Sequence, residues 1–291
     1  MTLVRHWAII PAVMLLAGCA SIAGQWSDPI APPDHKNALD RQLLENVRLA
    51  YANSDNESLL RNAIETMEAL LDEAPHHREL RVDLAEAYTL LGAAYTNSRT
   101  LKRQHFLTAQ GHAERVLLSR PEFRMTLERG ERPGLAARHL DADDVPAMVI
   151  WSTATSYLFD EGMTAIGRVR HYRGLEDLRL FMERALELDP DYEYGLVPFS
   201  LAIFYIATPS FAGGNLNRAE QLIEQAIATP GTSLMPHWGR ARYLHSLTGD
   251  HRAKRADLEW VLAQDARAVD SPYHWNVYVQ RDARRMLAEL R

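Results

Sequence analysis

The chain has 291 residues, of which 47% are hydrophobic and 24% charged, and its formal net charge is −6. This composition excludes a disordered or collagen-like polymer, because enough apolar side chains are present to bury a sizeable core. The acidic balance and the dispersal of the arginines argue against nucleic-acid binding, which depends on clustered lysine and arginine.

The first residues are typical of an export signal. A short basic start with Arg5 precedes an apolar stretch over 7–16, which is shorter than the roughly 20 residues needed to span a bilayer. The run Leu16-Ala17-Gly18-Cys19 then resembles the lipobox of bacterial lipoproteins, where cleavage precedes a cysteine that becomes acylated. We therefore predict a signal peptide over 1–18 and lipidation at Cys19; an ordinary signal peptide with an incidental cysteine is the alternative.

The residues after the predicted cleavage site indicate which membrane the mature protein is anchored to. By resemblance to Gram-negative lipoproteins, Ala20 and Ser21 lack the aspartate that retains such proteins at the inner membrane. We expect the mature protein in the periplasm, anchored by acyl chains to the inner leaflet of the outer membrane. Cys19 is the only cysteine, so no disulfide is expected within the mature chain. The proline-rich range 19–34 is predicted to be a lipidated tether, followed by a helical domain over 35–291.

From about His35 onward, apolar residues recur at helical spacing and strand-like alternation is absent, which predicts an all-α fold. Ser54 with Glu57 has the spacing of a capping box, and Ser271-Pro272 has the pattern of a helix start. Four prolines are each expected to follow the end of a helix, since proline lacks the amide donor: Pro75, Pro121, Pro190 and Pro230.

Three of these helices have apolar side chains at the same offsets before their proline. The positions are Ala63, Met67 and Leu70; Ala109, Ala113 and Val116; and Leu178, Met182 and Ala185. The run from Ala185 to Pro190 resembles the second helix of a tetratricopeptide (TPR) repeat, and Leu84, Ala85 and Tyr88 match its first helix. We predict an α-solenoid of degenerate TPR-like helix pairs.

The array is predicted to be irregular. We expect 97–104 to interrupt one pair, 121–145 to separate two others, and irregular helices to form around 148–159. The last unit has Trp238 and Gly249-Asp250 in register, although Ala266 replaces its terminal proline. The helix over 273–290 is predicted to cap the solenoid.

Three segments together resemble one family. They are Val149-Ile150-Trp151 followed by Ala154, the helix end from Ala185 to Pro190, and Pro209-Ser210-Phe211-Ala212-Gly213-Gly214 leading to Ala219. They are similar to the T component of TRAP transporters, TatT, a periplasmic lipoprotein built on hybrid TPR repeats. The resemblance implies a homo-oligomer, in particular a trimer, that docks the substrate-binding subunit of a sodium-coupled organic-acid importer and can hold a hydrophobic ligand. Residues 121–145 and Ala266 do not match the family pattern.

Catalytic and metal motifs are missing from the sequence. There is no His-Glu-x-x-His motif, Walker loop or glycine-flanked serine elbow. His105 with His112 and His237 with His245 lie about two turns apart, which favours surface or groove histidines over metal ligands, and Pro75 breaks the spacing of Glu73 and His76. We predict no catalytic residue, no metal and no cofactor.

Two loop motifs have a binding and a structural interpretation. Asp141, Asp143 and Asp144 could hold a cation or cap the next helix, and capping is favoured. Gly213-Gly214 could cradle an anion or form a tight turn with positive φ, and the turn is favoured.

Aromatic residues concentrate in the predicted first helices of the pairs. They are Tyr88, Tyr95, Trp151, Tyr157, Phe199, Phe204, Tyr205 and Phe211. Most of them are expected to be core residues, and others could line a groove that binds a partner or an apolar ligand. Phe199 and Tyr205 are the first two candidates for mutation.

The leading hypothesis is a non-enzymatic accessory lipoprotein that binds a TRAP substrate-binding subunit through its concave helical surface. The alternative is a general TPR scaffold lipoprotein for cell-envelope assembly, which shares the fold and anchor but has another partner. A hydrolase using histidine and aspartate from the loops is a third, less favoured hypothesis.

Overall fold

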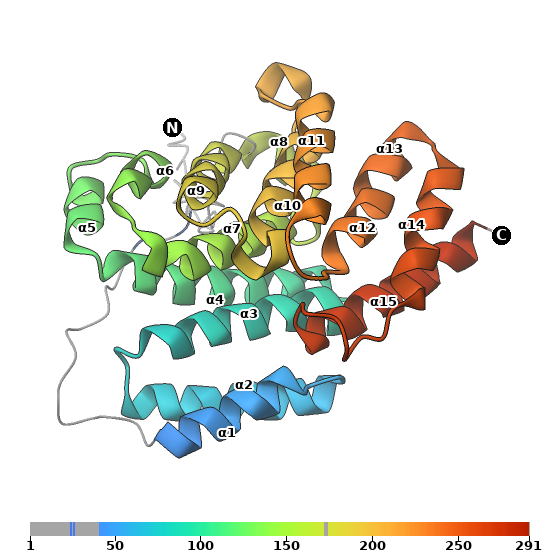
Figure 1. Ribbon diagram of the computed structural model, residues 1–291. Helices are drawn as coiled ribbons and strands as arrows, with labels where there is room; N and C mark the ends of the chain where they lie inside the picture. Colours follow the sequence, from blue (N-terminus) through green and yellow to red (C-terminus); the bar gives the residue numbers. More distant parts are fainter. Residues whose placement is uncertain (1–23, 25, 27–40, 172–173, 291) are drawn as a thin grey trace, which may run out of the picture.

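The computed structural model describes residues 24, 26, 41–171 and 174–290 (Figure 1). Within these ranges all regular structure is helical and no strand occurs, so the predicted all-α class is confirmed. Among the same residues, no helix combines the length and the apolar character needed to cross a membrane. The predicted signal peptide and Cys19 lie outside the described residues.

The N-terminal half is a stack of neighbouring helices. α1 (Arg41–Ala52), α2 (Glu57–Glu73), α3 (Arg78–Tyr95) and α4 (Arg99–Leu118) each pack on the preceding one, and α7 (Val145–Asp160) covers α3 and α4. The nine apolar positions found before the three prolines are all buried, as predicted from their spacing. The four prolines also follow helix ends, as predicted. Repeated packing positions therefore do form the core, while the TPR arrangement itself stays a prediction.

The segment between α4 and α7 is more helical than predicted. It forms α5 (Pro121–Glu128), α6 (Pro133–Ala136) and two short 3-10 turns over 137–139 and 142–144. Each of the two helices has proline in its first turn, where the missing amide donor costs nothing. α6 packs on α9, where the Gly134 amide donates to Asp177 Oδ1 at 3.1 Å.

The C-terminal half begins with α8 (Ala165–His171), α9 (Leu175–Leu188), α10 (Tyr192–Ala207) and α11 (Leu216–Ala228). α10 packs on α7, α9 and α11. The chain then forms α12 (Met235–Gly239), a π-helical turn over 240–245, α13 (Ser246–Thr248), α14 (His251–Ala263) and α15 (Tyr273–Glu289).

Three local predictions were wrong. α2 is capped by Asn56, whose side chain accepts from the Leu59 amide, whereas the Ser54 hydroxyl is buried and donates to the Tyr51 carbonyl. The predicted interruption over 97–104 is mostly the first turn and a half of α4, which begins at Arg99. The irregular helices expected over 148–159 are one α-helix, α7, which is buried on several sides and so lacks the one-sided pattern of a surface helix.

The last helix packs back on the first part of the chain (Figure 1). The Tyr273 hydroxyl donates to Asp55 Oδ2 at 3.1 Å, and the Trp275 Nε1 donates to Glu86 Oε1 at 2.7 Å. Near the end of α3, the Arg281 guanidinium donates to the Ala94 carbonyl and lies 4.7 Å from the Tyr95 ring centroid. α15 thus joins the two ends of the helical array instead of covering only its last unit.

Trp26 packs against the core, and the aromatic residues that it contacts are distant from it in sequence. Its ring centroid is 5.5 Å from Phe123, 5.6 Å from Trp151 and 6.0 Å from Phe181. Its backbone amide donates to Glu114 Oε2 at 3.1 Å, and the Trp151 Nε1 donates to Glu114 Oε1 at 3.0 Å. A buried carboxylate therefore holds a residue of the predicted tether and a core tryptophan together.

Candidate functional site

A cavity of about 390 Å³ lies between α7 and α10 and extends to α3, α12 and the start of α15. Its wall follows the regular part of α10 from Leu196 to Ala207, which corresponds to roughly 17 Å at 1.5 Å rise per residue. Most of the lining is apolar, with Val149, Ile150, Leu196, Ile203 and Phe204 among the side chains. An elongated apolar cavity of this size falls in the range of small-molecule binding sites.

The start of α10 has an unusual backbone. Three successive residues adopt positive φ, with 45° at Glu193, 58° at Tyr194 and 88° at Gly195. Positive φ is uncommon for residues other than glycine and costs free energy, and such residues often occur at functional sites. The regular helix begins after this turn, so Pro198 falls near its beginning. The turn places Glu193 in the cavity wall.

Two carboxylates line this part of the cavity. Glu86 accepts from the Trp275 Nε1 at 2.7 Å and lies 3.3 Å from the His274 Nε2. Burial would raise the pKa of Glu86, but the hydrogen bonds with His274 and Trp275 hold it below its ordinary value. Burial and then the negative charge of Glu86 raise the pKa of Glu193 to about 8. The two carboxyl groups therefore differ in protonation at neutral pH.

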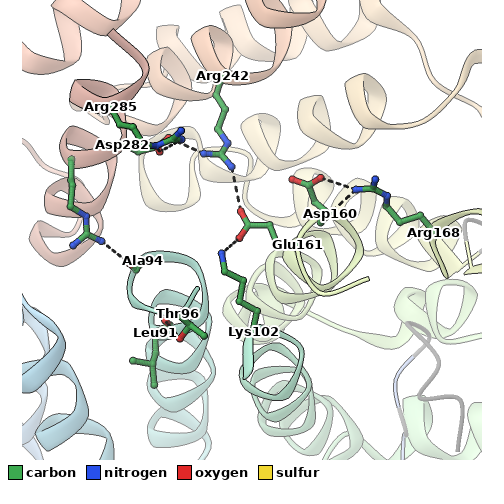
Figure 2. Close-up of polar contacts among 11 residues, drawn as sticks. Leu91, Ala94, Thr96, Lys102, Asp160, Glu161, Arg168, Arg242, Asp282 and Arg285 are labelled. Atoms are coloured by element: carbon green, nitrogen blue, oxygen red, sulfur yellow. Dashed lines mark hydrogen bonds and ion pairs between the residues drawn. The ribbon is translucent and has the colours of Figure 1, made fainter. Parts of the chain in front are cut away.

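A second polar pair lines the cavity. The Arg168 guanidinium lies 3.5 Å from Asp160 Oδ1 and also donates to the Asp160 carbonyl at 3.0 Å. Figure 2 shows this pair beside the end of α7. Both side chains are partly exposed, 40% for Arg168 and 53% for Asp160, so the pair is hydrated and contributes little to stability.

Comparison with known proteins decides the family. A family model described as TRAP transporter T-component matches residues 57–291. The chain belongs to the TRAP transporter T-component family. It is therefore an accessory component of a TRAP transporter, and the resemblance seen in the sequence is confirmed. No curated protein matches the chain.

The structure places the predicted aromatic residues of this T component in different surroundings. Tyr157, Phe199 and Phe204 line the cavity, whereas Trp151 is fully buried in the core behind it. The other four lie elsewhere. The Tyr88 hydroxyl donates a hydrogen bond to Glu68, and the Tyr205 hydroxyl donates one to Glu183 at 3.3 Å. The Arg281 guanidinium lies over the Tyr95 ring, and Phe211 is 85% exposed in the turn Ser210–Ala212. A binding role for any of these eight residues stays a prediction.

Neither of the two cavity carboxylates was predicted as a site residue from the sequence. Glu86 lies two residues before Tyr88 but belongs to no recognised motif, and Glu193 enters the wall only through the left-handed turn. Gly195 is the one visible signal, because glycine after a run of polar residues favours positive φ. Nothing in the sequence showed that the two flanking residues would share this conformation.

The histidine pair His237 and His245 converges on one carboxylate. His237 Nδ1 lies 2.9 Å from Asp257 Oδ1, and His245 Nε2 lies 3.2 Å from Asp257 Oδ2. Arg240 binds the same carboxylate. Burial acts to raise the pKa of Asp257, but the hydrogen bonds with Arg240 and His237 lower it to about 2. In the described part of the chain, no three histidine, cysteine or acidic side chains are arranged to hold a metal.

The two loop motifs are structural, as favoured from the sequence. Asp141 accepts from the Asp143 amide, and Asp144 accepts from the Asp141 amide, which completes a capping box. Arg78 and Arg120 bind the buried Asp144 carboxylate. Gly213 has a φ of 103°, as expected for a tight turn after α10.

Proposed function

We propose that this T component is a periplasmic lipoprotein, acylated at Cys19, that binds the substrate-binding subunit of its TRAP transporter and holds an apolar ligand. The observation that carries the ligand role is the apolar cavity between α7 and α10. Burial of an apolar ligand there would gain roughly 25 cal/mol for each Å² removed from water. Membership of the T-component family supports the transporter role.

We propose a binding function without catalysis. The described lining contains serine, threonine and tyrosine hydroxyls but no histidine, cysteine or lysine. A nucleophile would need such a base within hydrogen-bond reach. Glu86 already accepts from Trp275, and Glu193 is largely protonated near neutral pH, so neither is arranged to activate a serine.

The partner is tested by affinity purification of the full chain, tagged at its C-terminus, from detergent-solubilised membranes. We expect the periplasmic substrate-binding subunit of a TRAP transporter to co-purify, and native mass spectrometry of the eluate to give three copies of the T component. A Cys19→Ser variant should lose labelled palmitate and leave the membrane fraction. Recovery of outer-membrane assembly proteins alone would contradict the transporter role and favour a general envelope scaffold.

A further inference from the structure

The polar side chains of the cavity wall have an excess of negative charge. Glu86, Asp160 and Glu193 line it, and Arg168 is the one basic residue in its described lining. Asp160 and Arg168 form their own ion pair at 3.5 Å. Neither of the other two carboxyl groups, Glu86 and Glu193, has a basic partner among the described lining residues.

Glu193 has fewer hydrogen-bond partners than Glu86. Glu86 has two partners on α15, namely the Trp275 Nε1 and the His274 Nε2. Glu193 Oε1 accepts from the Tyr192 hydroxyl at 3.2 Å, whereas within the described residues Oε2 has no donor and no basic side chain pairs with the carboxylate. An ionised carboxylate without a counter-ion is unfavourable in a mostly apolar cavity wall, and the φ of 45° adds backbone strain to this position.

We infer that the cavity selects apolar ligands that have a cationic head group, and that Glu193 binds this cation. The inference rests on the proposed ligand-binding role of the cavity and names the chemistry of its ligand. The alkyl part lies along the apolar face of α10, and the cation lies between Glu193 and Glu86.

A ligand with a carboxylate fits this wall poorly. Its charge would lie near the ionised Glu86, and like charges at short distance in a poorly hydrated site repel strongly, while Glu193 offers it no positive charge. Arg168 is the basic residue that could bind it, but this side chain already pairs with Asp160 and is 40% exposed. An uncharged alcohol would gain a hydrogen bond but no charge pairing, so its affinity should lie between the two.

The protonation of Glu193 supports the same assignment. Burial, then Glu86 and Asp83 on α3, raise its pKa to about 8, and the Tyr192 hydroxyl opposes this rise. A bound cation favours the ionised carboxylate, so Glu193 must release a proton on binding. Affinity for a cationic ligand should therefore increase as the pH rises from about 6 to about 8.

The test is isothermal titration of the purified full chain in detergent with decylamine, decanoic acid and decanol. At neutral pH we expect decylammonium to bind at least about tenfold more tightly than decanoate. Glu193→Gln, which is nearly isosteric, should reduce this ratio to about twofold, leave decanol unchanged and remove the pH dependence. The control Glu187→Gln lies at an exposed ion pair with Arg184, outside the cavity, and should keep the wild-type ratio.

Two cavity-filling variants, Ile203→Trp and Ala207→Phe, separate this inference from the proposed function. Circular dichroism identifies which of them retain the helical fold. If such a variant weakens all three ligands but decanoate binds as well as decylammonium, the cavity holds apolar ligands and the head-group inference is wrong. An unchanged ratio of decylammonium to decanoate affinity in Glu193→Gln also contradicts the head-group inference. If none of the three ligands binds the wild-type protein, the ligand part of the proposed function fails as well.

Discussion

His112 shows how a single titratable side chain can couple folding to pH. The imidazole lies on α4 with its plane 13° from that of Tyr88, and its Nδ1 is buried without a hydrogen bond in the described structure. Burial, and then the positive charges of Arg81 and Arg115, lower the pKa of His112 to about 3. The folded protein therefore keeps this imidazole neutral at pH values where an unfolded chain protonates it.

Acidification should consequently destabilise the protein through His112. Between about pH 6.5 and pH 3 the unfolded state binds a proton that the folded state does not, so the free energy of unfolding falls as the pH falls. We expect His112→Phe, which keeps a ring against Tyr88, to weaken this dependence by up to about 1 kcal/mol per pH unit. Urea denaturation at several pH values measures it. The control is His251→Phe at an exposed position, and equal pH slopes in the two variants would contradict the role of His112.

At the scale of helices, the left-handed turn at the start of α10 depends on Gly195. Its φ is 88°, and a Cβ added there would lie 2.6 Å from the Ala226 carbonyl oxygen at the end of α11. The position therefore needs glycine for two reasons, backbone conformation and close approach of two helices. Since the same turn carries Glu193, the geometry of the cavity wall depends on this contact.

Gly195→Ala should destabilise the protein by about 2 to 4 kcal/mol, because positive φ and overpacking both contribute. Gly130→Ala is a matched control, since Gly130 has a φ of 86° but nothing lies within 4 Å of an added Cβ. The control should cost only about 1 kcal/mol. Thermal and urea unfolding measure both variants, and equal losses would show that the approach to α11 is not tight.

The helices could be predicted because their signals are local. The positions before Pro75, Pro121 and Pro190 repeat a packing pattern along one helix, and all of them are buried. The cap of α2 could not be decided, since Ser54 and Asn56 are both good N-cap residues and only the tertiary position of the Ser54 hydroxyl distinguishes them. The cavity could not be predicted, because Tyr194 has no local reason to adopt positive φ.

At the scale of the molecule, a chain of ion pairs joins segments distant in sequence (Figure 2). Lys102 on α4 binds Glu161 after α7, which lies 3.3 Å from Arg242. Arg242 lies 2.8 Å from Asp282 on α15, and the Asp282 carboxylate also binds Arg285. Its ion pairs join residues up to 81 positions apart, and contacts at such separations have no local signature in the sequence, so the closure by α15 could not be predicted in this form.

Glu161→Gln should weaken this closure. Removing the shared carboxylate leaves two poorly exposed cations, Lys102 and Arg242, with less compensation, so we expect a loss of about 1 to 3 kcal/mol in urea unfolding. Glu128→Gln is the control, since its side chain is 66% exposed and 3.8 Å from Arg124, and it should cost less than about 0.5 kcal/mol. A similar loss in both variants would mean that the network adds no more than a surface pair.

If the proposed acylation of Cys19 occurs, the packing of Trp26 limits the distance between the helical body and the lipid surface. Trp26 is seven positions after Cys19, and an extended chain spans at most about 3.5 Å per position, or roughly 25 Å. With acyl chains on Cys19, the free part of the tether would end at Trp26 instead of near α1. The helical body would then lie close to the lipid headgroups with its Trp26 side facing the bilayer. A soluble partner would bind to a surface of the body that faces away from the membrane.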